Sequence, residues 1–259
     1  NPTSGNVYYD GKDIFKYNHA EQKEFCKKVQ MIFQNPYSSL NPRMTVKDIV
    51  GEGLKQHGMS TKDADAKVEQ LLATVGLNKD HMSRFPHEFS GGQRQRIGIA
   101  RALSVDPEFI ICDEPISALD VSIQAQVINM LKELQEERGL TYLFIAHDLS
   151  VVKYISDRVV VMYLGTMVET AETDELYAHP MHPYTQALLG AQFSIHMDPS
   201  QKIQSIESEA PSPLDVPKGC PFQNRCENCT DRCKAEMPKL KEIAPGHAVA
   251  CFYVEEQKI

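Results

Sequence analysis

Short apolar runs alternate along this chain with longer segments in which apolar residues recur every three or four positions. The runs at 29–33, 109–112 and 141–146 predict buried strands, because they are short, continuous and rich in β-branched or aromatic residues. Helical spacing occupies the segments between and after them: 13–28, most of 42–89, 93–104, 123–138 and 149–156. This alternation predicts an α/β fold with a mainly parallel sheet that helices cover on both faces.

The last third of the chain has a different character. The runs 158–164 and 166–169 predict a hairpin about Gly165. The stretch 192–219 holds four prolines and no sustained periodicity, which is typical of a linker. We therefore predict three parts: a large domain over 1–191, a linker over 192–219 and a small cysteine-rich extension over 220–259.

Acidic residues outnumber basic ones, 35 against 27, which gives a net charge of −8 over 259 residues. That balance argues against a nucleic-acid binder with a broad basic face and against electrostatic adhesion to anionic lipid. No apolar run approaches the length of a membrane span. We therefore expect any attachment to a membrane to come through a protein partner.

Two adjacent carboxylates, Asp113 and Glu114, follow the apolar run at 109–112. Parallel sheets bind their ligands at the carboxyl ends of the strands, and neighbouring strand residues point to opposite sides. One carboxylate can hold Mg²⁺ through water while the other faces an attacking water, which fits phosphoryl transfer. The alternative is a strand that is simply followed by polar residues.

The sequence Ser90-Gly91-Gly92-Gln93 opens the helix predicted at 93–104. Exposed N–H groups and the helix dipole make such a terminus an anion site, and glycines let the backbone approach a phosphate closely. Ser90 is also a favourable N-cap, so a purely structural role is the alternative.

The stretches FSGGQRQR at 89–96 and FIICDEPISALD at 109–120 together resemble the signature motif, Walker B strand and D-loop of ATP-binding-cassette (ABC) ATPases. The resemblance implies a P-loop NTPase-type ABC domain over 1–191 that binds ATP and Mg²⁺. It also implies an inserted helical subdomain at about 42–105. The nucleotide-binding residues that it implies are Ser90, Gly91, Gly92, Gln93, Asp113 and Asp120.

The same resemblance implies a role for each of five polar residues. Glu114 would act on the attacking water, Asp113 would hold Mg²⁺, and Gln34, which matches the Q-loop glutamine, would contact Mg²⁺ or the attacking water. His147 matches the switch histidine, which reaches the terminal phosphate, and Asp120 matches the D-loop carboxylate at the dimer interface. Structural alternatives remain open: a turn residue for Gln34, a structural histidine for His147 and a helix cap for Asp120.

Three further stretches, FQNPYSSLNPR, DVSIQAQVINMLKELQ and HPMHPYTQALL, are similar to the oligopeptide/dipeptide (peptide/nickel) importer subfamily, in particular the "F" member of its paired ATPases. This similarity implies ATP-driven import of oligopeptides or dipeptides. The implied partners are a second ABC ATPase subunit, two transmembrane permease subunits and, indirectly, an extracytoplasmic peptide-binding protein. The implied location is peripheral, on the cytoplasmic side of the cell membrane, with no nucleic-acid partner.

Seven cysteines are present, and five of them lie between positions 220 and 251. Cys220, Cys226, Cys233 and Cys251 match the C-terminal pattern of the subfamily, which implies a [4Fe–4S] cluster of the kind that some members hold. Cys229 departs from that pattern and creates C-x₂-C-x₃-C, a spacing that also suits Zn²⁺. Thiols without a metal are the third alternative.

No G-x-x-x-x-G-K-[ST] phosphate loop occurs in the sequence. The opening residues resemble the segment shortly after the helix of that loop, so we expect the loop to lie upstream of Asn1. We also expect the chain by itself to be inactive toward ATP, because the lysine loop is the main cradle for the β- and γ-phosphates.

Two other classes of function compete with peptide import. Soluble ABC ATPases that act on ribosomes or DNA usually carry tandem cassettes or long coiled-coil insertions, and this sequence shows neither. A non-hydrolytic metal or redox module would use the cassette only as a scaffold. Co-purification with a permease or with ribosomes distinguishes the peptide importer from a soluble ABC ATPase. ATP binding distinguishes the importer from a metal or redox module.

Overall fold

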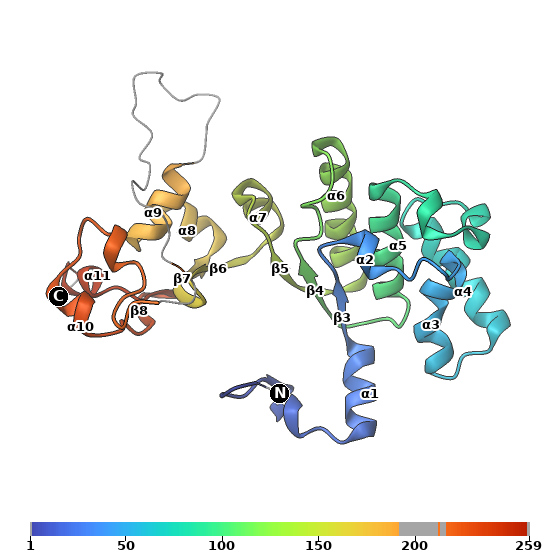
Figure 1. Ribbon diagram of the computed structural model, residues 1–259, viewed down its shortest axis with the longest axis horizontal. Helices are drawn as coiled ribbons and strands as arrows, with labels where there is room; N and C mark the ends of the chain where they lie inside the picture. Colours follow the sequence, from blue (N-terminus) through green and yellow to red (C-terminus); the bar gives the residue numbers. More distant parts are fainter. Residues whose placement is uncertain (1, 192–211, 213–215, 258–259) are drawn as a thin grey trace. The chain divides into compact units, whose positions relative to one another are not determined.

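Three apolar strands pair in parallel at the centre of the first half of the chain. The computed structural model describes residues 2–191, 212 and 216–257, and it forms two compact units, Asn1–His147 and Asp148–Ile259 (Figure 1). The first unit contains, in chain order, β1 (Tyr8–Tyr9), β2 (Lys12–Asp13), η1 (Ile14–Lys16), α1 (His19–Lys28), β3 (Val29–Ile32), α2 (Pro36–Ser39), α3 (Val46–Gln56), α4 (Thr61–Thr74), η2 (Lys79–Ser83), η3 (Pro86–Glu88), α5 (Gly91–Leu103), β4 (Phe109–Asp113), α6 (Val121–Arg138) and β5 (Thr141–Ile145).

The first helix begins later than the sequence pattern predicts. The helical spacing over 13–28 divides into the short 3₁₀ turn η1 and the helix α1. Asn18 separates them, because its side chain accepts hydrogen bonds from the N–H groups of Ala20 and Glu21 while the Glu21 carboxylate accepts from the N–H of Asn18. Such a capping box fixes an extended backbone at the cap residue, so α1 starts there.

The strands β3, β4 and β5 form a parallel sheet in that order, with Ile32 opposite Cys112 and Cys112 opposite Phe144. One face is the core: Ile32, Ile110 and Cys112 are almost fully buried. The helix α6 lies on this side of β5, since the Tyr142 hydroxyl donates to the carbonyl of Leu131 at 2.9 Å.

The other face of β5 is open to solvent. Leu143 and Ile145, at alternate positions of β5, are 50% and 45% exposed. The prediction that helices cover both faces of the sheet is therefore wrong for β5 in the described part of the chain. Among the described residues, no helix covers the side chains of Leu143 and Ile145.

The helical region between β3 and β4 confirms the pattern seen in the sequence. The predicted apolar faces of α3 and α4 are buried almost completely, and their members are Val46, Ile49, Val50, Leu54, Val68, Leu71, Leu72 and Val75. Gly76 follows α4 with φ of 73°, a left-handed conformation that glycine adopts without strain, so it ends the helix as predicted.

The second unit is built on the predicted hairpin about Gly165. Its described elements are α7 (Leu149–Ile155), β6 (Arg158–Tyr163), β7 (Thr166–Glu172), α8 (Thr173–Ala178), α9 (Pro183–Gly190), η4 (Gln223–Arg225), α10 (Asp231–Ala235), β8 (Lys241–Ala244), β9 (His247–Val249) and α11 (Phe252–Gln257). The sheet order is β6-β7-β9-β8, so the cysteine-rich extension adds two strands to the hairpin. Most of the predicted linker 192–219 lies outside the described residues.

The extension shares its core with the hairpin. Cys220, Phe222 and Cys233 pack in one buried cluster with residues of β6, β7 and α8, among them Tyr163 and Leu176. The Phe222 ring lies 5.3 Å from the ring of Tyr163, centroid to centroid, in an edge-on arrangement. A segment of this size has too little core to fold alone, and here the hairpin supplies the missing apolar surface.

A buried contact between a glutamate and a histidine also connects the hairpin with the extension. The Glu169 carboxylate, in β7, accepts hydrogen bonds from the N–H groups of Met181 and His182 at 2.7 and 3.0 Å. The Nε2 atom of His247, in β9, lies 2.7 Å from the same carboxylate, and both side chains are fully buried. The HPMHPY stretch and the extension are thus joined through one glutamate.

Candidate active site

The predicted carboxylates stand where β4 ends. Asp113 is the last residue of β4, and Glu114 follows with φ of 42°, in the left-handed region that non-glycine residues rarely adopt. The N–H of Glu114 donates to the carbonyl of Ile145 at 3.0 Å, and its carbonyl accepts from the N–H and the hydroxyl of Ser117. A strained backbone held on both sides is typical of a functional turn, because the surrounding bonds must offset its cost.

Three of the predicted residues meet at this turn, each from the carboxyl end of a different strand. Gln34 follows β3, Glu114 follows β4 and His147 follows β5. The Nε2 atom of Gln34 donates to Oε2 of Glu114 at 2.6 Å. The Nδ1 atom of His147 lies 3.7 Å from Oε1 of Glu114, within ion-pair range but too long for a hydrogen bond.

The side chains of Glu114 and His147 differ in their exposure to solvent. The Glu114 side chain is 27% exposed, whereas that of His147 is 74% exposed. The glutamate is therefore partly withdrawn from water and oriented by Gln34, while the histidine is free to reach a group that arrives from solvent. Adjacent parallel strands place these residues together, as expected for ligand sites in α/β sheets.

The glycine-containing turn has the geometry of a helix cap. Ser90 is the N-cap of α5: its hydroxyl accepts from the N–H of Gln93 at 3.4 Å, and the Gln93 side chain accepts from the N–H of Ser90 at 3.0 Å. A Cβ added to Gly92 would lie 2.6 Å from Cγ2 of Ile123. Gly92 is thus required by close packing against α6, whereas Gly91 has no atom nearer than 3.8 Å in the described structure.

Asp120 is the N-cap of α6. Its Oδ1 accepts from the N–H of Ile123 at 3.2 Å and from the hydroxyl of Ser122 at 3.3 Å. The capping role that the sequence left open is therefore realised, and a role at a dimer interface stays a prediction for this residue.

Two arginines of α5 that the sequence reasoning did not single out contact the segment around Gln34. The guanidinium of Arg94 lies over the Tyr37 ring, and Arg101 donates to the carbonyl of Ser39. Their spacing of seven residues, about two helical turns, places both arginines on one face of α5 and is the feature of the sequence that could have identified them. The segment they would contact is not recognisable from the sequence.

The cysteines of the extension do not form a recognisable metal site. Burial raises the pKa of Cys220 and of Cys226 to about 11, and it also raises the pKa of Cys251 and of Cys229. Within residues 2–191, 212 and 216–257, no group of three or more His, Cys, Asp or Glu side chains is placed to hold a metal ion. The predicted [4Fe–4S] cluster or Zn²⁺ on Cys220, Cys226, Cys233 and Cys251 therefore has no support. Three of these thiols are buried in apolar clusters, and the partly buried Cys226 packs against one of them.

No helix among the described residues is long and apolar enough to cross a membrane.

Comparisons with known proteins agree with the geometry. Residues 1–117 match the ABC transporter family, and residues 168–233 match the oligopeptide/dipeptide transporter C-terminal region. The oligopeptide transport ATP-binding protein AppF of Bacillus subtilis is 54% identical over 254 residues, which are 96% of this chain and 77% of AppF. OppF of the same organism, also described as an oligopeptide transport ATP-binding protein, is 54% identical over 98% of this chain and 78% of its own length.

Solved structures show the same fold. The cbiO1 protein from Clostridium perfringens, part of the ABC transporter complex cbiONQ, superposes with a TM-score of 0.61 and 27% identity over 69% of this chain and 70% of its own. A dimeric ATP-binding cassette in a post-hydrolysis state, bound to ADP and Pi, superposes with a TM-score of 0.59 and 28% identity over 66% of this chain and 75% of its own. With the convergence of Gln34, Glu114 and His147, these matches show that the chain belongs to the ATP-binding proteins of ABC transporters, in the oligopeptide/dipeptide transporter subfamily.

Proposed function

We propose that this chain is the ATP-binding and ATP-hydrolysing subunit that energises import of oligopeptides or dipeptides. The observation that carries the hydrolytic part is the convergence of Gln34 and His147 on the Glu114 carboxylate. The peptide part is supported by relatives such as AppF and OppF, whose names describe oligopeptide transport. The soluble ABC ATPase and the non-hydrolytic module are not favoured, because the named relatives are transport proteins.

Glu114 is the proposed general base. Gln34 donates to Oε2, which fixes the orientation of the carboxylate and leaves Oε1 on the side of His147. An oriented, partly shielded carboxylate can accept a proton from an attacking water as the water's oxygen approaches the terminal phosphate. His147 would then contact that phosphate, since its side chain is 74% exposed and lies beside Oε1 of Glu114.

Asp113 and Gln34 are the residues that would hold Mg²⁺, and the donor set fits, because carboxylate and amide oxygens are the ligands this ion prefers. When bound, Mg²⁺ neutralises charge on the phosphate oxygens. The N-terminus of α5, with Ser90, Gly91, Gly92 and Gln93, would contact the nucleotide across a dimer, together with the D-loop carboxylate Asp120. Gly91 and Gly92 are the first two residues of α5, and the N–H groups at the start of a helix attract a phosphate, which supports this assignment.

We further propose the assembly and the domain plan that the subfamily implies. A second ABC ATPase subunit would complete the nucleotide sites, two permease subunits would attach the pair to the cytoplasmic face of the membrane, and a peptide-binding protein would deliver the cargo. The proposed ABC domain covers 1–191 with the helical subdomain at about 42–105, and the linker 192–219 leads to the extension 220–259. No metal is assigned to the cysteines.

The test is the Glu114→Gln substitution in the complete subunit, expressed from its whole gene and assembled with its partner ATPase and permeases. The amide keeps the shape of the side chain but cannot take a proton, so peptide-stimulated hydrolysis should fall by about 10²- to 10⁴-fold while ATP binding is kept. His147→Ala should also lose most turnover. Glu133→Gln, an exposed carboxylate of α6, is the matched control and should hydrolyse ATP normally. Near-normal hydrolysis by Glu114→Gln would remove Glu114 from the reaction.

A further inference from the structure

The segment 33–39, which carries Gln34 and α2, lies against one face of α5. The contacts come from Arg94 and Arg101, which stand seven residues apart and therefore on the same face of the helix, two turns from each other. Arg101 contacts both ends of the segment, at Phe33 and Ser39, and Arg94 contacts Tyr37 between them.

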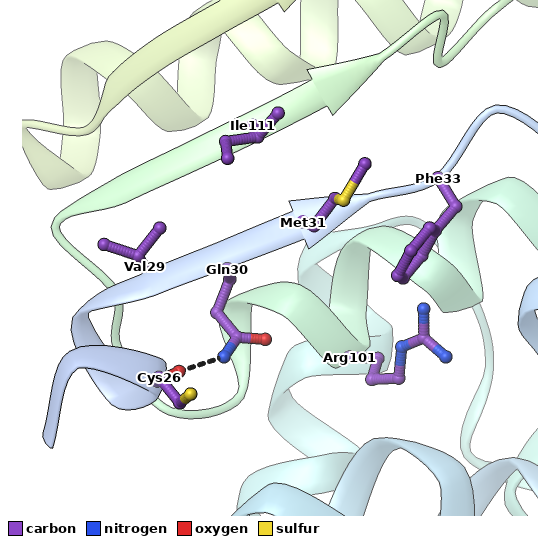
Figure 2. Close-up of a pocket in the computed structure, with 7 residues that line it drawn as sticks. All are labelled: Cys26, Val29, Gln30, Met31, Phe33, Arg101 and Ile111. Carbon is purple, nitrogen blue, oxygen red and sulfur yellow. Dashed lines mark hydrogen bonds between the residues drawn. The ribbon is translucent and has the colours of Figure 1, made fainter. Parts of the chain in front are cut away.

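Arg101 contacts two groups that lie on either side of Gln34 in the sequence. Its Nη1 donates to the carbonyl of Ser39 at 2.5 Å, and its guanidinium lies 5.5 Å from the centroid of the Phe33 ring. Figure 2 shows the Arg101 side chain directed toward the Phe33 ring, at the end of a cavity of about 270 Å³ along β3. Burial lowers the pKa of Arg101, and the nearby Glu52 carboxylate partly offsets that effect.

Arg94 contacts the middle of the segment, at Tyr37. Its guanidinium lies 3.9 Å from the centroid of the Tyr37 ring, and its side chain is almost fully buried. The same guanidinium donates to the carbonyls of Pro86 at 2.6 Å and His87 at 3.3 Å, in the turn that precedes Ser90. A desolvated guanidinium over an aromatic face is a favourable and directional contact. Arg94 thus connects Tyr37 with the approach to the signature turn.

We propose that Arg101 and Arg94 are positioning residues for Gln34, which hold its amide against Glu114. This inference rests on the proposed ATPase function. Phe33, Tyr37 and Ser39 are fixed to α5, so the amide that donates to Glu114 at 2.6 Å moves with that helix. A shift of α5, which also carries Ser90 at its start, would therefore change the orientation of the proposed base.

The test is a double-mutant cycle in the complete subunit, assembled with its partner ATPase and permeases, with kcat and KM for ATP measured for each variant. The variants are Arg101→Met, Gln34→Ala and the pair together. Arg101→Met should lower kcat by about tenfold and leave KM within about twofold, because Arg101 acts on the base through Gln34 and not on ATP. In the Gln34→Ala background, which should itself lower kcat, the same change should cost less than about twofold.

Two further variants protect the test against a misfolded protein. Arg101→Lys keeps a donor for the Ser39 carbonyl and should restore part of the lost kcat. Tyr37→Leu changes a side chain that is 61% exposed, so the fold should be kept while the contact with Arg94 is lost and kcat falls. Arg138→Met is the matched arginine control: Arg138, the last residue of α6, pairs with Asp106, away from the Gln34 segment, and its loss should leave kcat unchanged.

The outcomes separate the two proposals. If the unaltered transporter hydrolyses no ATP, the proposed function fails. If it hydrolyses ATP and the losses from Arg101→Met and Gln34→Ala simply multiply in the double variant, or if Gln34→Ala has the unaltered rate, only the positioning role is overturned. A normal kcat for both Arg101→Met and Tyr37→Leu would overturn it as well.

Discussion

At the scale of single residues, the glycines of the signature turn have separate tasks. Gly92 leaves no room for a side chain, because Ile123 of α6 stands where a Cβ would be, whereas a Cβ on Gly91 would make only ordinary contacts. Sequence reasoning assigned both glycines to the approach of a phosphate. The structure adds that one of them also fixes the distance between α5 and α6.

We expect Gly92→Ala to destabilise the protein by about 1–3 kcal/mol, because the β-branched Ile123 side chain is held close to its own backbone and cannot move aside freely. Thermal or denaturant unfolding measures the effect. Gly98→Ala, in the middle of the same helix with no atom within 4 Å of the added Cβ, is the control and should be neutral or stabilising by about 0.5–1 kcal/mol. Equal stability of the two variants would contradict the packing role of Gly92.

His182, the N-cap of α9, makes stability depend on pH. Burial lowers its pKa to about 4 from 6.5, although the Glu169 carboxylate acts in the opposite direction. The unfolded chain therefore takes up a proton at higher pH than the folded protein. The free energy of unfolding should fall as the pH drops from about 6.5 to about 4, by up to about 3 kcal/mol from this group.

Denaturant unfolding of wild type and His182→Asn, between about pH 7 and about pH 4.5, checks this dependence. The asparagine keeps an acceptor for the N–H of Tyr184, which His182 now binds through Nδ1 at 3.0 Å, but it does not titrate. The variant should lose less stability on acidification than the wild type does. Parallel pH curves for the two proteins would assign the acid sensitivity to other groups.

At the scale of elements, burial divides the apolar residues into those that build the core and those that do not. Leu72, in α4, is fully buried, whereas Leu143, in β5, is 50% exposed. Both lie in segments whose apolar pattern predicts a regular element, and both elements are present. The pattern identified the elements correctly, but it assigned two covered faces to a sheet whose strand β5 has one.

We expect Leu72→Ala to cost about 2–5 kcal/mol of the free energy of unfolding, because it leaves a cavity between α4 and its neighbours. Leu143→Ala removes the same atoms from a half-exposed site and should cost less than about 1 kcal/mol. Denaturant titration of both variants supplies the comparison. A large loss in Leu143→Ala would show that its side chain is covered in the protein as tested.

At the scale of the whole molecule, the proposed chemistry and the cysteine-rich extension fall in different compact units. Gln34, Glu114 and His147 belong to Asn1–His147, and the extension belongs to Asp148–Ile259. The extension is held by the hairpin core and by the buried contact of His247 with Glu169. Loosening the extension is therefore expected to spare ATP hydrolysis.

His247→Ala should loosen β8 and β9, because it leaves the buried Glu169 carboxylate without its partner from β9. Hydrogen exchange over 241–257 should rise, while kcat for ATP in the assembled transporter stays within about twofold. His247→Gln, which keeps an N–H donor, is the conservative control and should exchange more slowly than the alanine variant. Loss of hydrolysis in His247→Ala with a folded first unit would contradict this separation.

The sequence by itself determined the local elements, the motif residues and the family, because capping, apolar spacing and short motifs are properties of neighbours along the chain. Tertiary structure alone decided which of these residues meet: Gln34 with Glu114 across 80 positions, Arg101 with Ser39 across 62, and His247 with Glu169 across 78. Local spacing and motifs along the chain do not indicate which residues far apart in the sequence come into contact. The four-cysteine pattern suggested a metal, whereas the packing places Cys220 and Cys233 in an apolar core shared with the hairpin, Cys226 at the edge of that core and Cys251 in a second apolar cluster.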